Sequence, residues 1–336
     1  MVVVTAPTGL VCSLGSPCAA GPVPSRTVLA LLFPGQGSQR PQMGIPWKDH
    51  PAWALVDRIS EAAGRDVGSL LLDADAETLK ATRNAQLAAF ALSMVVLYAA
   101  RSSALEYAPA PRAVAGHSLG EYTALTAAGA LDPEGAARLV AARGDAMQAA
   151  ADREPGTMAA VLGLGPEEVT AACATVEGAW PANDNAPGQY VISGTPAGVE
   201  AAGEAARGLG AKRVMGLAVG GAFHSPLMAP AQGRLDEALA AAHFHDSEVD
   251  VVTNVDASVH RSGWQELLSR QLVSPVRWRE SLLTMERLGV TSYLELGPGS
   301  ELSGMVKRTI DGSHRANVAV PGDLDSLPGF LEAASD

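Results

Sequence analysis

The chain of 336 residues is 47% hydrophobic and carries 24 Lys and Arg against 36 Asp and Glu, a net charge of −12. This length predicts one large domain with a smaller insertion, and the acidic balance without a basic run excludes nucleic acid as an expected partner. No apolar run predicts a membrane span, and three cysteines are too few for a disulfide framework and favour a reducing cytoplasm.

Residues 1–25 are rich in Gly, Pro, Ala and Val and lack the cationic start and the continuous apolar stretch of a secretory signal, so we expect a disordered extension. Residues 28–33 form a continuous apolar run, which is typical of a strand buried on both faces. The Gly-rich loop 34–39 follows at the carboxyl end of that strand, where parallel sheets bind ligands. It lacks the ending of a phosphate-binding loop, which leaves Gln36 as its useful polar group.

Helical patterns follow at residues 53–63, 75–82 and 84–101. The third is apolar nearly all round, so it should lie sandwiched inside the large domain. Gln86 in its first turn is polar among apolar neighbours. It is either a core amide with satisfied hydrogen bonds or a supporting residue of a functional site, and the sequence leaves both interpretations open.

Residues 116–120 have the Gly-x-Ser-x-Gly form of a nucleophile elbow. A short apolar strand at 113–115 precedes them and a helix over 119–130 follows, which is the order that an elbow requires. Gly116 and Gly120 relieve the crowding of so sharp a turn, and Ser118 would then project over the positive end of the helix. The pattern predicts a catalytic serine, and a Gly-rich packing turn is the structural alternative.

The next predicted helix, residues 133–151, carries Arg143. Its neighbours Ala141, Ala142 and Gly144 are small and leave room for the guanidinium to project into a cleft. An ordinary surface arginine would have the same neighbours, so the pattern alone leaves that reading open.

From residue 156 the pattern changes to strand 158–163, helix 166–173, strands 180–183 and 189–193 with an Asn-rich turn at 183–185 between them, helix 196–209 and strand 213–218. This order is that of a ferredoxin-like unit. The sequence therefore predicts an α/β fold with two parts. An α/β-hydrolase-like large subdomain with a parallel central sheet, residues 26–153 and 219–320, receives a ferredoxin-like small subdomain, residues 154–218, and residues 321–336 form a C-terminal tail.

The chain returns to the large subdomain through a Gly-Gly loop that contains His224, followed by helix 226–242, strand 249–254, helix 264–271, strand 293–296 and a helix from residue 301. A catalytic serine needs a base, and histidine has the pKa that suits one near neutrality. His224 is favoured among the seven histidines because its loop enters the active face of the large subdomain.

The other histidines have weaker contexts. His117 adjoins Ser118, so the turn should aim its ring away and pack it beneath the elbow. His243 and His245 lack the further ligands of a zinc site, so no metal is expected.

No convincing strand-end Asp or Glu lies between Ser118 and His224, as the triad of an α/β-hydrolase would require. We therefore expect a Ser-His dyad whose ring is oriented by a backbone carbonyl. The backbone N–H of Leu119 lies at the elbow and supplies one oxyanion donor, and the loop near Gln36 should supply the second.

The assembled motifs resemble those of malonyl-CoA:acyl-carrier-protein transacylases and of the acyltransferase domains of polyketide synthases. They are residues 33–39, 116–121, 143–144, 221–225, 271–272, 275–278 and 297–299, in family order between residues 28 and 310. The resemblance implies that Ser118 is the acylated nucleophile and that His224 is its base, oriented by the main-chain carbonyl of Gln271. Gln36 and Leu119 would supply the oxyanion-hole amides.

The resemblance also implies that Arg143 holds the free carboxylate of a malonyl group, since a guanidinium makes charge-assisted bonds of roughly 1.5 to 3 kcal/mol to a carboxylate. Leu119 and Phe223 resemble the malonyl-selective form. Phe223 would crowd a substituent on carbon 2, although one methyl is worth only about 1 to 3 kcal/mol. Gln86 and His117 are expected to support the site.

Malonyl-CoA is thus the implied substrate, with no permanently bound cofactor, and a phosphopantetheinylated acyl carrier protein is the implied partner, in fatty-acid or polyketide synthesis. Because such a carrier is acidic, basic residues should rim the cleft, and the candidates are Lys212, Arg213, Arg277, Arg279, Lys307 and Arg308. A transacylase for a substituted malonyl group and a serine hydrolase or thioesterase with the same dyad are the alternatives.

Overall fold

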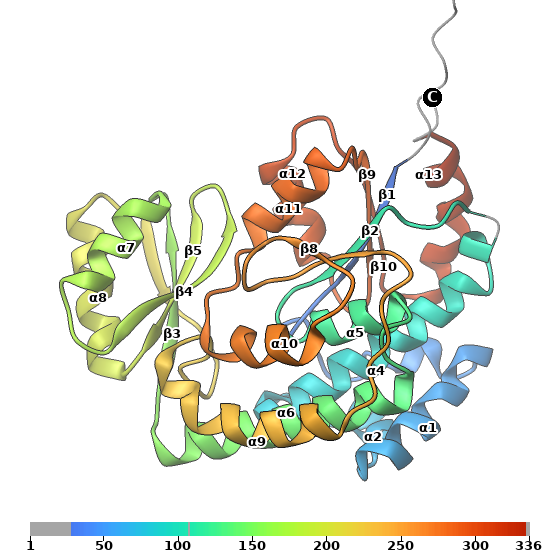
Figure 1. Cartoon of the computed structure of the whole chain (residues 1–336), viewed down its shortest axis with the longest axis horizontal. Helices are drawn as coiled ribbons and strands as arrows, with labels where there is room; N and C mark the ends of the chain where they lie inside the picture. The colour runs from blue at the N-terminus through green and yellow to red at the C-terminus, as the bar shows by residue number, and fades with distance from the viewer. Residues whose placement is uncertain (1–27, 107, 334–336) are drawn as a thin grey trace, which may run out of the picture.

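The computed structural model describes residues 28–106 and 108–333, so the extension predicted for residues 1–25 lies outside the described residues. Two sheets lie side by side in the described part, a six-stranded central sheet and a four-stranded sheet (Figure 1). The strand order of the central sheet is β10 (His314–Val318), β9 (Ser292–Leu296), β1 (Leu29–Phe33), β2 (Ala113–Gly116), β7 (Asp250–Val252), β8 (Val259–His260). All neighbours pair in parallel except β7 and β8, so the chain has an α/β fold with a largely parallel central sheet.

Helices cover both faces of this sheet, which explains the continuous apolar run of β1. Leu31 and Phe33 belong to one core cluster, whereas Leu32 packs in a second cluster on the other face with Trp278 and Leu282. The first cluster is shared by α1 (Ala54–Ala63), α2 (Val67–Leu72), α4 (Thr82–Arg101), α5 (Gly120–Ala127), α6 (Pro133–Arg153), α9 (Ala229–Ala241) and α10 (Trp264–Val273). The second cluster is shared by α11 (Trp278–Arg287) and α12 (Glu301–Thr309).

The other helices that precede or follow the four-stranded sheet in the chain are short. They are α3 (Ala76–Lys80), α13 (Leu327–Ala333) and the 3-10 helices η1 (Ile45–Trp47), η2 (Pro51–Trp53), η3 (Ala104–Glu106), η4 (Pro226–Met228) and η5 (Pro321–Ser326). The segment expected to be a C-terminal tail is therefore helical over its described part, and Leu327 is buried in the large core.

Helix α4 has the length and apolar composition of a membrane span, which corrects the expectation that no apolar run reaches one. However, 83% of its apolar window is buried inside the protein. This burial confirms the prediction that the all-round apolar helix lies within the large domain, because a core helix in contact with other elements on every side needs no polar stripe.

The four-stranded sheet is antiparallel, in the order β4 (Ala179–Ala186), β5 (Gln189–Gly194), β3 (Thr157–Leu162), β6 (Arg213–Gly216). Along the chain these strands alternate with α7 (Pro166–Ala174) and α8 (Pro196–Gly208), in the order β3-α7-β4-β5-α8-β6. Both helices lie on the face of this sheet that is turned away from the central sheet (Figure 1).

The Asn-rich turn predicted at residues 183–185 is wrong. Strand β4 continues to Ala186 with irregular register at two places, and the chain turns at Gly188, whose φ is 69°. Bulges absorb extra residues without ending a strand. Consequently Asn183 and Asn185 lie in a strand beside the elbow rather than at a solvent-facing turn.

Candidate active site

The elbow lies between the end of β2 and the start of α5, as predicted. Ser118 has φ of 52°, in the left-handed region that residues other than glycine rarely adopt. A Cβ on Gly116 would lie 1.9 Å from the carbonyl of Gly120, and a Cβ on Gly120 would lie 2.1 Å from the carbonyl oxygen of Phe33. Only glycine fits at these two positions, because the backbone of Gly116 packs against Gly120 and that of Gly120 packs against Phe33. This close packing places Ser118 at the end of the strand.

Alanine at Gly116 should destabilise the protein by at least about 3 kcal/mol, because the clashing atoms are backbone and cannot move aside cheaply. The matched control is Gly233→Ala in α9, where an added Cβ meets nothing within 4 Å. That change should raise stability by about 0.5 to 1 kcal/mol, since alanine favours a helix over glycine. Urea unfolding of both variants checks the prediction, and an unchanged midpoint for Gly116→Ala would contradict it.

His224 contacts the serine directly. Its Nε2 lies 2.7 Å from Ser118 Oγ, and its Nδ1 lies 3.1 Å from the carbonyl oxygen of Gln271 and 3.2 Å from that of Ser274. A carbonyl only accepts, so Nδ1 carries the hydrogen and Nε2 is left to accept from the serine hydroxyl. Both carbonyls lie at the C-terminal end of α10, where helix carbonyls lack their usual partner four residues on, and that of Gln271 accepts only a long bond of 3.4 Å from the Ser274 N–H besides the histidine.

The electrostatics keep this histidine neutral. Burial, reinforced by the positive charge of Arg143, lowers the pKa of His224 to about 3, although the carbonyls of Gln271 and Ser274 oppose the shift. His224 also has a left-handed backbone, with φ of 57°. Ser118 and His224, which are in contact, therefore both have left-handed backbone conformations. Such strain is typical of functional sites, where the surrounding structure imposes it.

Arg143 extends from α6 into the same site and is 1% exposed, which excludes the surface-arginine alternative. One terminal nitrogen donates to Gln86 Oε1 at 2.7 Å, and the other donates to Ser118 Oγ at 3.0 Å and to Gln271 Oε1 at 3.1 Å. Its Nε has no partner, and no carboxylate of the described chain forms an ion pair with it. A buried guanidinium without a counter-anion can bind an anionic group of a ligand beside the serine.

The two candidate oxyanion donors belong to the loop after β1 and to the start of α5. Gln36 follows β1 and its side chain accepts from Gln86 Nε2 at 3.3 Å, so Gln86 joins Gln36 to Arg143. Leu119 is fully buried at the start of α5. Neither the Gln36 nor the Leu119 peptide N–H donates to another group in the described part of the chain, so both are free for a ligand oxygen.

A cavity of about 100 Å³ opens at the dyad, and Phe223 and Met147 contribute apolar wall to it. A second cavity of about 240 Å³ adjoins it and shares four lining residues, Gln36, His117, Asn183 and Leu217. The pair therefore connects the dyad to the space between the central sheet and the four-stranded sheet. A long, narrow ligand has a route to Ser118 through the two cavities.

His117 lies on the wall of both cavities instead of beneath the elbow. Its Nε2 is 2.8 Å from Asn185 Oδ1, and its ring lies 5.5 Å from that of Trp278. Burial lowers its pKa, so the neutral ring donates from Nε2 to Asn185. His117 thus joins the elbow to strand β4 of the four-stranded sheet.

Sequence reasoning missed two residues beneath the elbow, Asn254 and Glu121. Asn254 Oδ1 accepts from Ser118 N at 2.6 Å, and Glu121 Oε2 accepts from Asn254 N at 2.9 Å and from Gln271 Nε2 at 3.2 Å. Burial raises the pKa of Glu121 to about 7, against those hydrogen bonds and the charge of Arg143. Glu121 directly follows the elbow motif and could have been found there, whereas only the parallel pairing of β2 with β7 brings Asn254 close.

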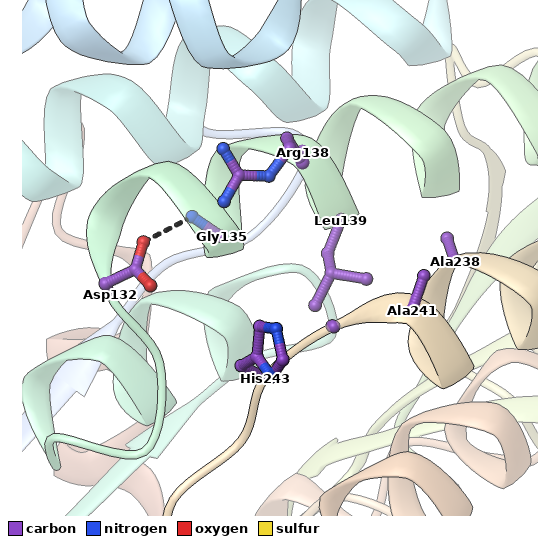
Figure 2. Close-up of a pocket in the computed structure, with 8 residues that line it drawn as sticks. Asp132, Gly135, Arg138, Leu139, Ala238, Ala241 and His243 are labelled. Carbon is purple, nitrogen blue, oxygen red and sulfur yellow. Dashed lines mark hydrogen bonds between the residues drawn. The ribbon is translucent and has the colours of Figure 1, made fainter.

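Another cavity, of about 280 Å³, lies between α6 and the end of α9 and is lined by no residue of the elbow (Figure 2). Asp132 caps α6 there by accepting from Gly135 N at 2.6 Å. Its polar side chains, Asp132, Arg138 and His243, are exposed. No group of three His, Cys, Asp or Glu side chains in the described residues could hold a metal ion, at His243 or elsewhere.

Comparisons with known proteins agree in one family. The sequence pattern described as "Acyl transferase domain" matches residues 30–326. The malonyl CoA-acyl carrier protein transacylase of Bacillus subtilis (strain 168) is 44% identical over 288 residues, which are 83% of this chain and 90% of that protein.

Solved structures give the same result. The acyl-carrier-protein S-malonyltransferase of Burkholderia pseudomallei 1710b is 39% identical, with a TM-score of 0.85 over 90% of this chain and 99% of that one. A malonyl-transacylase in complex with its type II polyketide synthase acyl carrier protein is 36% identical, with a TM-score of 0.85 over the same shares of the two chains. The chain therefore belongs to the malonyl-CoA:acyl carrier protein transacylases of the acyl transferase domain family.

Proposed function

We propose that this protein transfers a malonyl group from coenzyme A to the phosphopantetheine thiol of an acyl carrier protein, for fatty-acid or polyketide synthesis. The observation that carries the proposal is Arg143, a buried guanidinium 3.0 Å from Ser118 Oγ with no carboxylate partner in the described chain. A cation at this place favours an acyl group that ends in a carboxylate. The names of the curated relatives give malonyl as that group.

In the first half-reaction, Ser118 Oγ attacks the thioester carbonyl of malonyl-CoA, and its proton passes to His224 Nε2, 2.7 Å away. The oxyanion accepts from the N–H groups of Gln36 and Leu119. The C–S bond breaks, the proton on His224 goes to the departing CoA sulfur, and Ser118 is left as a malonyl ester. Arg143 turns its Nη2 from the serine hydroxyl to the malonyl carboxylate.

In the second half-reaction, the thiol of the carrier-bound phosphopantetheine attacks the ester carbonyl while His224 accepts its proton. The bond to Ser118 Oγ breaks, and the proton returns to the serine oxygen. The neutral form of His224 is needed at the start of both steps, which agrees with its low pKa. No cofactor takes part in this scheme.

The experiment that tests the proposal is intact-mass spectrometry after mixing with malonyl-, methylmalonyl- and acetyl-CoA in competition. We expect a persistent adduct of about 86 Da, the malonyl acyl group, which peptide mapping assigns to Ser118. Methylmalonyl should be disfavoured, because Phe223 lines the cavity, but a methyl group is worth only about 1 to 3 kcal/mol. Release of CoA and malonate without an adduct would instead identify a hydrolase or thioesterase, and a dominant methylmalonyl adduct would identify a substituted-malonyl transacylase.

Protonation of His224 should cause no inflection in the rate of acylation near pH 6.5, the ordinary pKa of histidine, because the pKa of His224 lies at about 3. Single-turnover rates between about pH 5 and 8 check this expectation. Glu121→Gln serves as the control, since it removes the other buried group, whose pKa is raised to about 7. A tenfold fall in that variant's rate on acidification through about pH 6.5 would contradict the assignment of a low pKa to the base.

The carrier is expected at the mouth of the adjoining cavity. Of the six basic candidates, Arg277 and Arg279 are already ion-paired with Glu280 and Asp184. The remaining candidates form no ion pair in the described part of the chain and are the ones we assign to an acidic carrier, Lys212, Arg213, Lys307 and Arg308.

The same proposal includes the finer architecture. We infer an α/β-hydrolase-like large subdomain over residues 26–153 and 219–320 and a ferredoxin-like small subdomain over residues 154–218, which the order β3-α7-β4-β5-α8-β6 supports. The cytoplasm is the compartment we assign, and the buried, unpaired Cys173 agrees with it.

A further inference from the structure

Side chains from two other segments hold the peptide groups around Ser118. Asn254 lies two residues after β7, the strand beside β2; its Oδ1 accepts from Ser118 N at 2.6 Å and its Nδ2 donates to the Gly116 carbonyl at 2.8 Å. Gln271 Nε2, on α10, donates to the Ser118 carbonyl at 2.9 Å. Three backbone groups of the turn are thus fixed by two amides that come from outside it.

The turn needs such support because Ser118 is held at φ of 52°. A serine in the left-handed region persists only where its surroundings over-determine it. The elbow glycines permit this conformation by leaving room, but they supply no attraction that would hold it. The Asn254 amide supplies that attraction on the N-terminal side of the serine, through the Ser118 N–H and the Gly116 carbonyl, and Gln271 holds the Ser118 carbonyl on the other side.

Asn254 is itself fixed in place. It is fully buried, its N–H donates to Glu121 Oε2 at 2.9 Å, and its carbonyl accepts from the N–H of Arg277 at 3.1 Å. The same Glu121 oxygen accepts from Gln271 Nε2 at 3.2 Å. The carboxylate therefore joins the two amides into one connected group beneath the serine.

The arrangement has a consequence for the oxyanion. The Ser118 N–H is occupied by Asn254, so it cannot serve as an oxyanion donor, and the free N–H of Leu119 is the one that the elbow offers. Asn254 fixes the N–H of Ser118, and Gln271 fixes the Ser118 carbonyl, which shares its peptide group with the Leu119 N–H. A rotation of Ser118 after loss of the Asn254 contact would move Oγ and that peptide group together, so the contact affects both nucleophile and donor.

We propose that Asn254 is a positioning residue for acyl transfer, which holds Ser118 Oγ and the Leu119 N–H in their reactive orientation while touching no substrate. This inference rests on the proposed function. It predicts that loss of the Asn254 amide slows the chemical step and leaves the binding of malonyl-CoA unchanged.

The test compares Asn254→Ala and Asn254→Asp with the wild type in single-turnover acylation by malonyl-CoA. Alanine removes both contacts, and we expect acylation to slow by about 100-fold, the scale of a 1 Å misplacement of a reacting group. Aspartate keeps the acceptor for the Ser118 N–H and loses the donor to Gly116 when ionised, so a loss of about tenfold is expected. Asn254→Asp also keeps the proposal testable should the alanine variant fail to fold.

The matched control is Thr253→Val. Thr253 is the preceding residue, is also fully buried, and donates to Asp256 Oδ1 at 2.8 Å, but it makes no hydrogen bond to the elbow. It tests whether any lost buried hydrogen bond in this segment slows acylation. Binding is measured separately, as the Kd of malonyl-CoA for Ser118→Ala with and without Asn254→Ala, and the two values should agree within about twofold.

Three outcomes would overturn the inference: acylation by Asn254→Ala within about threefold of the wild type, an equal slowing in Thr253→Val, or a Kd that rises as much as the rate falls. Each of them presupposes a wild-type protein that forms the malonyl adduct. A wild type that forms no adduct overturns the proposed function instead, so the two failures are distinguishable.

Discussion

His224→Ala should lower the rate of Ser118 acylation by roughly 10² to 10⁴-fold, the usual contribution of a general base. The Nε2 atom lies 2.7 Å from Ser118 Oγ and is the acceptor of the pair, because two carbonyls occupy the other side of the ring. Without it, the serine proton has no acceptor among its hydrogen-bond partners, since Arg143 only donates. Rapid-quench measurement of adduct formation from malonyl-CoA checks the prediction.

Ser118→Ala is the control for this experiment and should form no adduct, because the acylated oxygen is absent. Thermal unfolding of His224→Ala separates a lost base from a lost fold, since removal of the buried ring also leaves a cavity. An acylation rate within about tenfold of the wild type in a folded His224→Ala variant would show that another group accepts the proton.

Arg143→Ala should lower the kcat/KM for malonyl-CoA by roughly 10 to 150-fold, because charge-assisted hydrogen bonds are worth roughly 1.5 to 3 kcal/mol. The kcat/KM for acetyl-CoA should fall much less, since acetyl has no carboxylate to leave unpaired in a buried site. The variant should therefore lose its preference for the diacid. Competition between the two thioesters, read by intact mass, gives the ratio directly.

Two further variants make the result specific to the guanidinium. Arg143→Lys keeps the charge but not the planar fork, so it should recover only part of the preference. Arg138→Ala changes an exposed arginine one and a half turns earlier on the same helix, at the cavity of Figure 2, and should leave the ratio unchanged. An unchanged malonyl-to-acetyl ratio in Arg143→Ala would rule out the carboxylate-binding role.

Elements with a strong local pattern were predictable from the sequence. The apolar run of β1, the all-round apolar α4 and the strand-serine-helix order of the elbow all lie close to their predicted positions. Short or mixed segments were missed, namely α2, α11, α13, β8, β10 and the 3-10 helices η1, η2, η3 and η5. Edge strand β10 has only a half-buried pattern, and α11 begins three residues after Pro275, where the residues around a proline give no helical signal.

Within the site, the residues that carry chemistry had motifs around them, whereas the residues that hold them in place did not. Ser118 and His224 lie in Gly-rich turns that are visible in the sequence. Asn254 sits in a loop with no local signal, and its partner Ser118 is 136 residues away. The small residues around Arg143 fitted a surface residue as well as a site residue. Its 1% exposure and its contact with Ser118 show that it lies in the site.

The sequence by itself determined the elbow, the apolar strands and the order of the elements, because these depend on backbone sterics and on the hydrophobic period of nearby residues. Only the tertiary structure decided that His224, Arg143, Gln271 and Asn254 meet at one serine, that the ring is neutral and that the guanidinium lacks a counter-anion. The physical reason is that hydrogen bonds and desolvation act between atoms a few ångströms apart in space. Residues that are far apart in the sequence come within that distance only when the sheet brings its strand ends together.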